Sequence, residues 1–262
     1  MLAVAGGKGG AGKTTTTLGL AGALARQRRT VLAADADQEM PDLHAMAGVA
    51  RTPGLDAVAA GWPARLVAAS ADLPTASSPP ASAQTGDGAT SGVRVLPAAS
   101  GPADARQSGL ADAPRTGPAN AQKSRRSNSS DAAALGRIEA SADAVLLDCP
   151  AGAGPDAVAP LRVADAAVVV TTAEPACLRD ASKTAAMARE LDTPVAGAVV
   201  TRAGDPPEGI SRLLDCPVLG TVPDAGIESE SDAAATGDEP LEDDRVRAAH
   251  DELVSALQPK YL

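Results

Sequence analysis

The chain has 262 residues, a formal net charge of −10 and three cysteines. Its length is that of one domain with a substantial core. The negative charge argues against nonspecific nucleic-acid binding, because the phosphate backbone would repel such a surface. Cysteines this few and scattered exclude a disulfide framework, and without a Cys-x-x-Cys pair they give no support for a metal or redox site.

The composition is acidic, poor in lysine and low in bulky apolar residues, with no Phe, one Trp and one Tyr. It resembles that of proteins from salt-loving organisms, and a high-GC genome would give a similar enrichment in Ala and Arg. The chain begins in an apolar strand without a charged leader, and no apolar run is long enough to span a membrane. We therefore expect a cytoplasmic protein.

Short apolar runs alternate with polar, helix-like stretches along the chain. This alternation predicts a doubly wound α/β fold, in which a mostly parallel sheet has helices on both faces. Strands are expected at Leu2–Ala5, Thr30–Ala34, Val93–Leu96, Ala144–Leu147, Ala166–Thr171, Val195–Thr201 and Val218–Val222. Helices are expected at Thr15–Arg28, Arg179–Leu191 and Leu241–Leu257.

Two stretches, at about 75–91 and 101–131, are dominated by Ala, Ser, Pro, Gly, Thr and Asp. Stretches of this composition cannot bury enough apolar surface to order themselves. We interpret them as loop insertions within a single domain that covers residues 1–262.

A glycine-rich loop follows the first expected strand and precedes the first expected helix. Its spacing, Gly7-x-x-x-x-Gly12-Lys13-Thr14, satisfies the phosphate-loop pattern in full. Glycines let backbone N–H groups surround an anion, and the following helix offers its positive N-terminal end. Lys13 can reach the β- and γ-phosphates, and the Thr14 hydroxyl can ligate Mg²⁺. A glycine-rich turn without function is the alternative, which this strand–helix context disfavours.

Acidic side chains lie where two later strands are expected to end. Asp35 and Asp37 follow the second strand, where carboxylates could position a water and complete a Mg²⁺ shell through water. A helix or turn cap is the alternative role for these two. Asp148 follows another apolar strand, and an acid there can hold Mg²⁺ through a water. Cys149 is expected to be a small filler, because no histidine lies near it in the sequence.

A second lysine, Lys8, lies inside the loop. The string Lys8-Gly-Gly-Ala-Gly-Lys13-Thr-Thr resembles the deviant phosphate loop of the ParA/MinD family of ATPases. The resemblance implies that Lys8 reaches across a dimer interface to the nucleotide of the partner subunit; a solvated lysine is the alternative. It also implies that Asp37 orients the attacking water, that Asp35 lies near the metal, and that the turn Pro150-Ala151-Gly152 senses the γ-phosphate.

The resemblance continues toward the C-terminus. Thr201 and Arg202 match the place where many members carry Asn-Arg, whose amide contacts adenine, and Thr201 stands here instead of the Asn. Pro223 belongs to a segment similar to the loop beneath the adenine ring. Membrane-binding members end in a basic amphipathic helix, whereas the tail of this chain is mostly acidic, so we do not expect direct membrane binding.

Together these motifs predict four overlapping groups of site residues at the carboxyl edge of the sheet. They are the catalytic residues Lys8, Lys13 and Asp37; the metal-site residues Thr14, Asp35 and Asp148; the γ-phosphate sensors Pro150, Ala151 and Gly152; and the nucleotide-binding residues Gly7, Lys8, Gly9, Gly10, Ala11, Gly12, Lys13, Thr14, Thr15, Thr201, Arg202 and Pro223.

The resemblance implies an ATPase that binds ATP and Mg²⁺, dimerises around the nucleotide and hydrolyses it slowly. Such a switch would position a division site, a chromosome or plasmid, or a polar structure through an unidentified protein partner or activator. A metabolic ATP-dependent synthetase and an iron–sulfur or metal-centre carrier of the same superfamily are the alternatives. A binding module without hydrolysis is a third.

Overall fold

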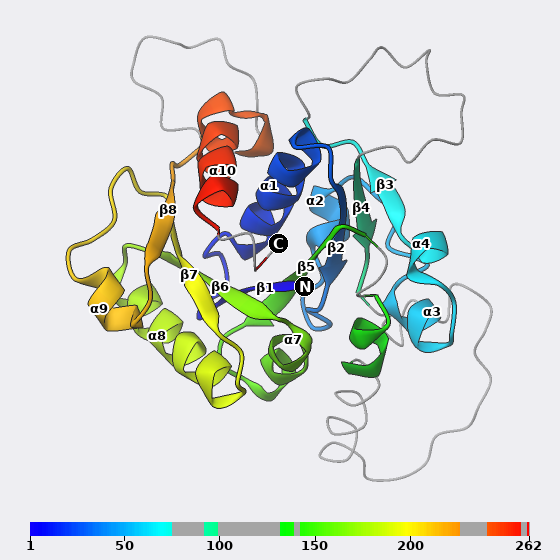
Figure 1. Cartoon of the computed structure of the whole chain (residues 1–262), viewed down its shortest axis with the longest axis horizontal. Coiled ribbons are helices and arrows are strands. Elements are labelled where there is room, and N and C mark those ends of the chain that lie inside the picture. The colour runs from blue at the N-terminus through cyan, green and yellow to red at the C-terminus, as the bar shows by residue number, and fades with distance from the viewer. Residues whose placement is uncertain (75–91, 99–131, 139–141, 226–239, 258–260, 262) are drawn as a thin grey trace.

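The computed structural model describes residues 1–74, 92–98, 132–138, 142–225, 240–257 and 261. The two expected loop insertions lie outside these residues. Within them, strands form one sheet with the order β3-β4-β2-β5-β1-β6-β7-β8 (Figure 1). Every neighbouring pair is parallel except β3 and β4, which are antiparallel. The strands are β1 (Leu2–Gly6), β2 (Thr30–Asp35), β3 (Ala69–Ala71), β4 (Gly92–Leu96), β5 (Ala144–Ala151), β6 (Ala166–Thr172), β7 (Val195–Thr201) and β8 (Val218–Val222).

Helices cover both faces of this sheet. Figure 1 shows α1, α2 and α10 on one side of the strands and α7 and α8 on the other. The helices are α1 (Lys13–Arg26), α2 (Leu43–Met46), α3 (Leu55–Ala59), α4 (Ala64–Val67), α7 (Val158–Val163), α8 (Pro175–Glu190), α9 (Ile210–Leu214) and α10 (Asp244–Ala256), with single 3₁₀ turns η2 (Pro155–Ala157) and η3 (Pro240–Glu242).

The two faces of β1 illustrate how the core is divided. Leu2 and Val4 pack in the cluster that includes the buried side chains of α1 and α10, whereas Ala3 and Ala5 pack in the cluster on the opposite face. This follows from the period of two in a strand, which sends alternate side chains to opposite faces. Because β1 is buried on both faces, it is apolar throughout, as central parallel strands are.

The doubly wound, mostly parallel sheet predicted from the sequence is confirmed, with differences at particular elements. The edge strand β3 was not predicted, because its sequence Ala-Ser-Ala contains no apolar run. Helix α8 begins at Pro175 rather than at Arg179, and proline is well suited to the first helical position.

Strand β5 also runs further than expected, to Ala151, so that Asp148 lies within the strand rather than at its end. Its register against β1 shifts after Asp148, since Val4 faces Asp148 but Gly6 faces Ala151. Pro150 lies in this irregular stretch, where a residue without an N–H is tolerated in a sheet.

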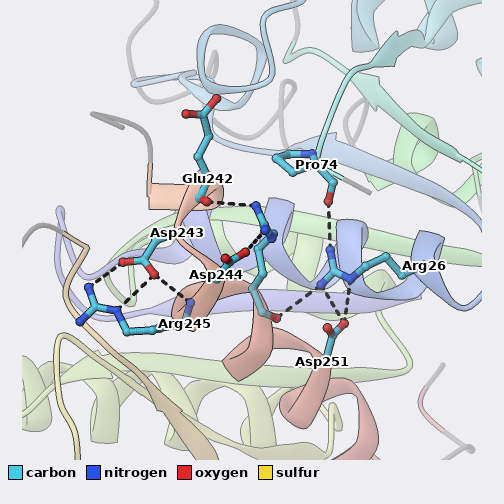
Figure 2. A network of polar contacts seen from close by, with 8 residues as sticks. Arg26, Pro74, Glu242, Asp243, Asp244, Arg245 and Asp251 are labelled. Atoms are coloured by element: carbon cyan, nitrogen blue, oxygen red, sulfur yellow. Dashed lines mark hydrogen bonds and ion pairs between the residues drawn. The ribbon is translucent and has the colours of Figure 1, made fainter. Parts of the chain in front are cut away.

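The C-terminal helix α10 is anchored to α1. Val246 and Leu253 are buried on α10, and Arg26 of α1 donates hydrogen bonds from Nε and Nη2 to Asp251 Oδ1, at 3.0 and 2.7 Å (Figure 2). The Arg26 guanidinium also donates to the carbonyl oxygens of Pro74, at 3.2 Å, and Arg247, at 3.4 Å. The apolar face of this acidic helix is therefore used inside the domain. In the part of the chain that the structure describes, no helix is long and apolar enough to cross a membrane.

Candidate functional site

The loop between β1 and α1 is shaped for an anion. Gly10 and Gly12 adopt positive φ angles of 74° and 85°, which glycine adopts without strain. Gly12 is the N-cap of α1, so no side chain caps the first N–H groups of the helix. These N–H groups and the positive end of the helix dipole are left available to a bound phosphate.

Two further glycines are required by close packing. A Cβ atom on Gly7 would lie 2.2 Å from the backbone carbon of Asp180 at α8, and one on Gly6 would lie 2.5 Å from the carbonyl oxygen of Val170. Side chains do not approach backbone atoms this closely, so any larger residue would displace the loop. Gly9 has no such neighbour among the described residues, and its backbone is open.

The two residues that follow the loop, Lys13 and Thr14, lie beside Gly6 and Asp42. The side chain of Lys13 is buried, and its Cγ and Cδ lie 3.3 Å from the place where a Cβ of Gly6 would be. Thr14 is half-buried and donates a hydrogen bond from Oγ1 to Asp42 Oδ1, at 3.0 Å. Thr15 is also half-buried. Lys13, Thr14 and Thr15 thus form the start of α1, directly after the loop.

Two buried carboxyl groups lie side by side next to α1. Asp35 on β2 and Asp148 on β5 occupy facing register positions. Burial, together with the charge of Asp148, raises the pKa of Asp35 to about 8. Burial also raises the pKa of Asp148 to about 7, although the charge of Lys13 and a hydrogen bond from Thr17 act in the opposite direction. Thr17 Oγ1 donates to Asp148 Oδ1 at 3.3 Å.

This arrangement fits a magnesium ion. Asp35 Oδ1 accepts a hydrogen bond from the backbone N–H of Asp37 at 2.9 Å, but the buried Oδ2 has no hydrogen-bond partner among the described residues. Two adjacent carboxylates also need a cation if both are to be ionised. In the described ranges no group of three or more His, Cys, Asp or Glu side chains could hold a metal by itself. Mg²⁺ typically uses one or two carboxylates with waters and substrate phosphates, so Thr14, Asp35 and Asp148 would be its protein contacts.

Asp37 acts as a turn cap in this structure. Its Oδ1 accepts hydrogen bonds from the backbone N–H groups of Glu39, at 3.1 Å, and Met40, at 2.9 Å. The residue is half-buried, and its charge raises the pKa of Asp35, which places it beside the metal-site acids. The capping role considered from the sequence is thus present. Asp37 Oδ2 makes neither of these hydrogen bonds, and the catalytic role of Asp37 stays a prediction.

The turn after β5 is joined directly to the phosphate loop. Gly152 has a φ of 88°, and its N–H donates to the carbonyl oxygen of Gly6 at 2.9 Å. Pro150 is buried and Ala151 is exposed. Cys149 is buried, and burial raises the pKa of its thiol, as expected of a filler residue rather than a nucleophile.

Lys8 lies on the outer side of the loop. Its Nζ is 3.6 Å from Glu174 Oε2, and the side chains of Lys8 and Glu174 are 51% and 64% exposed. An ion pair this exposed contributes about 0–1 kcal/mol. Lys8 is therefore held only weakly by its own chain.

The end of β7 also meets the phosphate loop. Thr201 Oγ1 lies 2.7 Å from the carbonyl oxygen of Ala11, and Arg202 Nη2 donates to the carbonyl oxygen of Gly10 at 2.7 Å. Pro223 follows Val222 of β8, which faces Thr201 in the sheet. All the residue groups predicted for the site are thus brought to one edge of the sheet.

Comparison with known proteins identifies the family. Residues 2–235 match the model of the CobQ/CobB/MinD/ParA nucleotide-binding domain. The chain belongs to this family. An uncharacterised ATP-binding protein of Methanocaldococcus jannaschii is 30% identical over 229 residues, which cover 85% of this chain and 74% of that protein.

Solved structures of the family share the fold. The septum site-determining protein MinD of Pyrococcus horikoshii, complexed with Mg-ADP, matches with a TM-score of 0.70 and 22% identity, covering 99% of this chain and 96% of that one. Cobyrinic acid a,c-diamide synthase of Mycobacterium smegmatis, with bound ADP and magnesium, matches with a TM-score of 0.64 and 22% identity, covering 98% and 92%. The same fold is therefore shared with a septum site-determining protein and with a cobyrinic acid a,c-diamide synthase.

Two polar residues near the site were given no role from the sequence. Asp42 accepts the hydrogen bond of Thr14, and Glu174 pairs with Lys8. Asp42 could have been found from its place in the segment Pro41-Asp42-Leu43, which closely follows Asp35 and Asp37 in the sequence. Glu174 precedes α8 in a segment that also resembles the family, but no role could be assigned to it, because its proximity to the loop depends on the packing of α8 against β1.

Proposed function

We propose that this protein is a Mg-ATP-dependent, dimerising switch ATPase of the ParA/MinD type. The observation that carries the proposal is the different placement of two lysines in one loop. Lys13 is 8% exposed, whereas the side chain of Lys8 is 51% exposed. A buried lysine serves the nucleotide of its own subunit, and an exposed lysine at the same loop can reach the nucleotide of a second subunit.

Catalysis would consist of positioning and electrostatic stabilisation. Lys13 and the N–H groups of the loop would hold the β- and γ-phosphates. Asp37 would turn from its capping role to orient the attacking water. Bound Mg²⁺ would neutralise charge on the phosphate oxygens. The hydrogen bond from Gly152 to Gly6 supports a sensing role for the turn Pro150-Ala151-Gly152, since it links that turn to the phosphate loop.

The intrachain contact of Lys8 is compatible with this role. Its pairing with Glu174 contributes at most about 1 kcal/mol, because both side chains are exposed. A triphosphate carries several negative charges and would compete effectively with one exposed carboxylate. In the dimer, Lys8 would therefore exchange Glu174 for the phosphates of the partner subunit's nucleotide.

Light scattering in the presence of Mg-ATP tests the proposal. In an Asp37→Ala background, which should slow hydrolysis, we expect ATP to produce dimers and ADP to leave monomers. Adding Lys8→Ala should abolish the dimer while ATP still binds through Lys13 and Thr14. Lys183→Ala is the matched control, because Lys183 is an exposed lysine on α8 that pairs with Asp180.

The salt dependence of dimerisation provides a second test. Each chain carries a formal charge of −10, so repulsion opposes association, and added KCl should favour the dimer. A protein that stays monomeric with ATP at every salt concentration would contradict the dimerising switch. Unchanged phosphate release in the Asp37→Ala variant would contradict the role of Asp37 alone.

We also propose that the switch serves to position a structure within the cell. A division site, a chromosome or plasmid, or a polar structure would be positioned through a protein partner, which pull-down with the ATP-locked Asp37→Ala variant should capture. The likeness to cobyrinic acid a,c-diamide synthase keeps an ATP-dependent synthetase as the second candidate. A synthetase would release phosphate only when its acid and amine substrates are supplied, whereas the switch would release it without them.

A further inference from the structure

We propose that Thr201 and Arg202 are positioning residues that hold the phosphate loop in its anion-binding shape, and that they act on the phosphates rather than on the base. This inference rests on the proposed nucleotide-binding function. It assigns both side chains a task that is independent of which nucleoside is bound.

The hydroxyl group of Thr201 is committed to the backbone. It is 6% exposed, and Oγ1 lies 2.7 Å from the carbonyl oxygen of Ala11 and 3.1 Å from that of Thr171. A threonine hydroxyl has one proton, and both neighbours are acceptors. Its proton therefore goes to the phosphate loop or to β6 and is unavailable to a nucleobase.

The methyl group of Thr201 faces the loop as well. Thr201 Cγ2 lies 3.2 Å from the place where a Cβ of Gly12 would be. The side chain thus contacts two consecutive loop residues, Ala11 through its hydroxyl group and Gly12 through its methyl group.

Arg202 fixes the preceding peptide group of the loop. Its Nη2 donates to the carbonyl oxygen of Gly10 at 2.7 Å, and its backbone has a φ of 54°. A left-handed backbone is unusual for a residue other than Gly, Asn or Asp. This conformation occurs directly after the last residue of β7.

The peptide geometry explains what these contacts accomplish. In a trans peptide the carbonyl group of one residue and the N–H of the next point in opposite directions. Holding the Gly10 and Ala11 carbonyl groups on the β7 side therefore turns the N–H groups of Ala11 and Gly12 away from β7. A row of N–H groups aimed to one side is a nest for a phosphate. Two side chains, one from the last residue of β7 and one from the residue after it, thus hold the loop in its binding shape before the nucleotide arrives.

Binding of Mg-ADP and of magnesium pyrophosphate, measured by calorimetry, tests the proposal. Pyrophosphate carries the phosphates without a base, and ADP has no γ-phosphate to lose. Thr201→Val keeps the shape and removes the hydroxyl proton, so we expect both affinities to fall by the same factor, about tenfold. Thr201→Ser keeps the hydroxyl group and should bind both ligands nearly as the wild type does. Arg202→Lys keeps the charge and loses the planar fork, and should weaken both ligands equally, by about threefold.

Each other outcome has a definite meaning. A loss for ADP with unchanged pyrophosphate binding would show that Thr201 touches the base, and would overturn the proposal. Unchanged affinities with a lower melting temperature would show a merely structural role, with the same consequence. A wild type that binds ADP but not pyrophosphate would show that the nest contributes little, which also overturns it. A wild type that binds neither ligand would overturn the proposed function itself, and this inference with it.

Discussion

The two ends of helix α1 have opposite characters. At the N-terminal end the cap is a glycine, the first turn contains lysine and threonine, and the neighbouring Asp35 has a buried oxygen without a partner among the described residues. At the C-terminal end Arg26 donates to Asp251 and to two backbone carbonyl oxygens (Figure 2). One end leaves polar groups unsatisfied, and the other satisfies them.

This contrast separates stability from function along a helix of 14 residues. Unsatisfied groups and adjacent buried acids cost stability, and they persist where a ligand completes them. The anchored end supplies the rigidity that keeps those groups in place. Substitutions at the two ends should therefore change different observables.

Lys13→Ala should have the largest effect and should affect binding alone. Removing the buried ammonium group from the loop should weaken Mg-ATP binding by at least ~2 kcal/mol, because a desolvated, charge-assisted contact is lost. The melting temperature without nucleotide should stay close to that of the wild type. Calorimetry and thermal unfolding measure the two quantities, with Lys183→Ala as the control. Retained ATP affinity would remove Lys13 from the site.

Gly19→Ala should instead disturb the packing of α1 against α10. A Cβ on Gly19 would lie 2.3 Å from His250 Nε2, and the His250 ring is fully buried against α1. We expect a loss of about 2 kcal/mol in the free energy of unfolding from overpacking, with little change in nucleotide affinity.

Gly22→Ala is the matched control on the same helix. Its Cβ would meet Arg26 Nη1 at 3.5 Å, an ordinary contact, so the gain in helix propensity should leave stability equal or higher. Denaturant unfolding of both variants measures the change in stability that each substitution causes. Equal effects at the two glycines would show that α10 does not restrict the surface of α1.

Asp35→Asn should raise the stability of the protein without ligand, whereas most substitutions of buried residues lower it. Above about pH 8, where the Asp35 carboxyl is ionised, the amide removes a buried charge beside Asp148, so the protein without ligand should be more stable by about 1 kcal/mol. Mg²⁺-dependent ADP binding should become weaker, because a carboxylate that faces the metal position is lost. Asp251→Asn, at the anchored end, should instead lower stability, because it weakens the pairing with Arg26. A destabilised Asp35→Asn variant would contradict this account.

The pH dependence contributed by His250 should be the smallest effect. Burial lowers the pKa of His250, and Arg26 adds to this effect, whereas the Val246 carbonyl and Asp251 oppose it. A lowered pKa means that the unfolded chain takes up the proton first, so stability is lost as the pH falls below 6.5. One proton limits the slope to about 1.4 kcal/mol per pH unit.

The comparison with His250→Gln isolates this contribution. Unfolding curves between about pH 7.5 and 5.5 should show the wild type losing stability relative to the variant as the pH falls. The difference between the two proteins is the useful quantity, because the raised pKa values of Asp35 and Asp148 act in the same range with the opposite sign. Parallel curves would show that His250 does not titrate between the folded and unfolded states.

The sequence predicted the strands closely, because apolar runs determine buried strands. The bounds of β7 and β8 agree with the prediction, and β1 differs by one residue. Short elements such as β3, α3 and α9 were not predicted, since three to five residues carry too little periodicity to be recognised. The order of the strands was not predicted either.

The site was predictable to the extent that its chemistry lies in contiguous motifs. The phosphate loop and the acids after two strands could be found from spacing alone. The contacts of Thr14 with Asp42, of Lys8 with Glu174 and of Thr201 with Ala11 could not, because each joins segments that only the sheet order brings together.

The position of β1 in the sheet has a consequence for biosynthesis. This strand is synthesised before β5 and β6, with which alone it pairs in the described sheet, and Ala5 finds its partner at Val169. Contacts between residues so distant in sequence form late, since a long loop must close first. A nascent chain therefore carries its phosphate loop on an unpaired β1 until β5 has been synthesised. We therefore expect nucleotide to stabilise the chain only after β1 has paired.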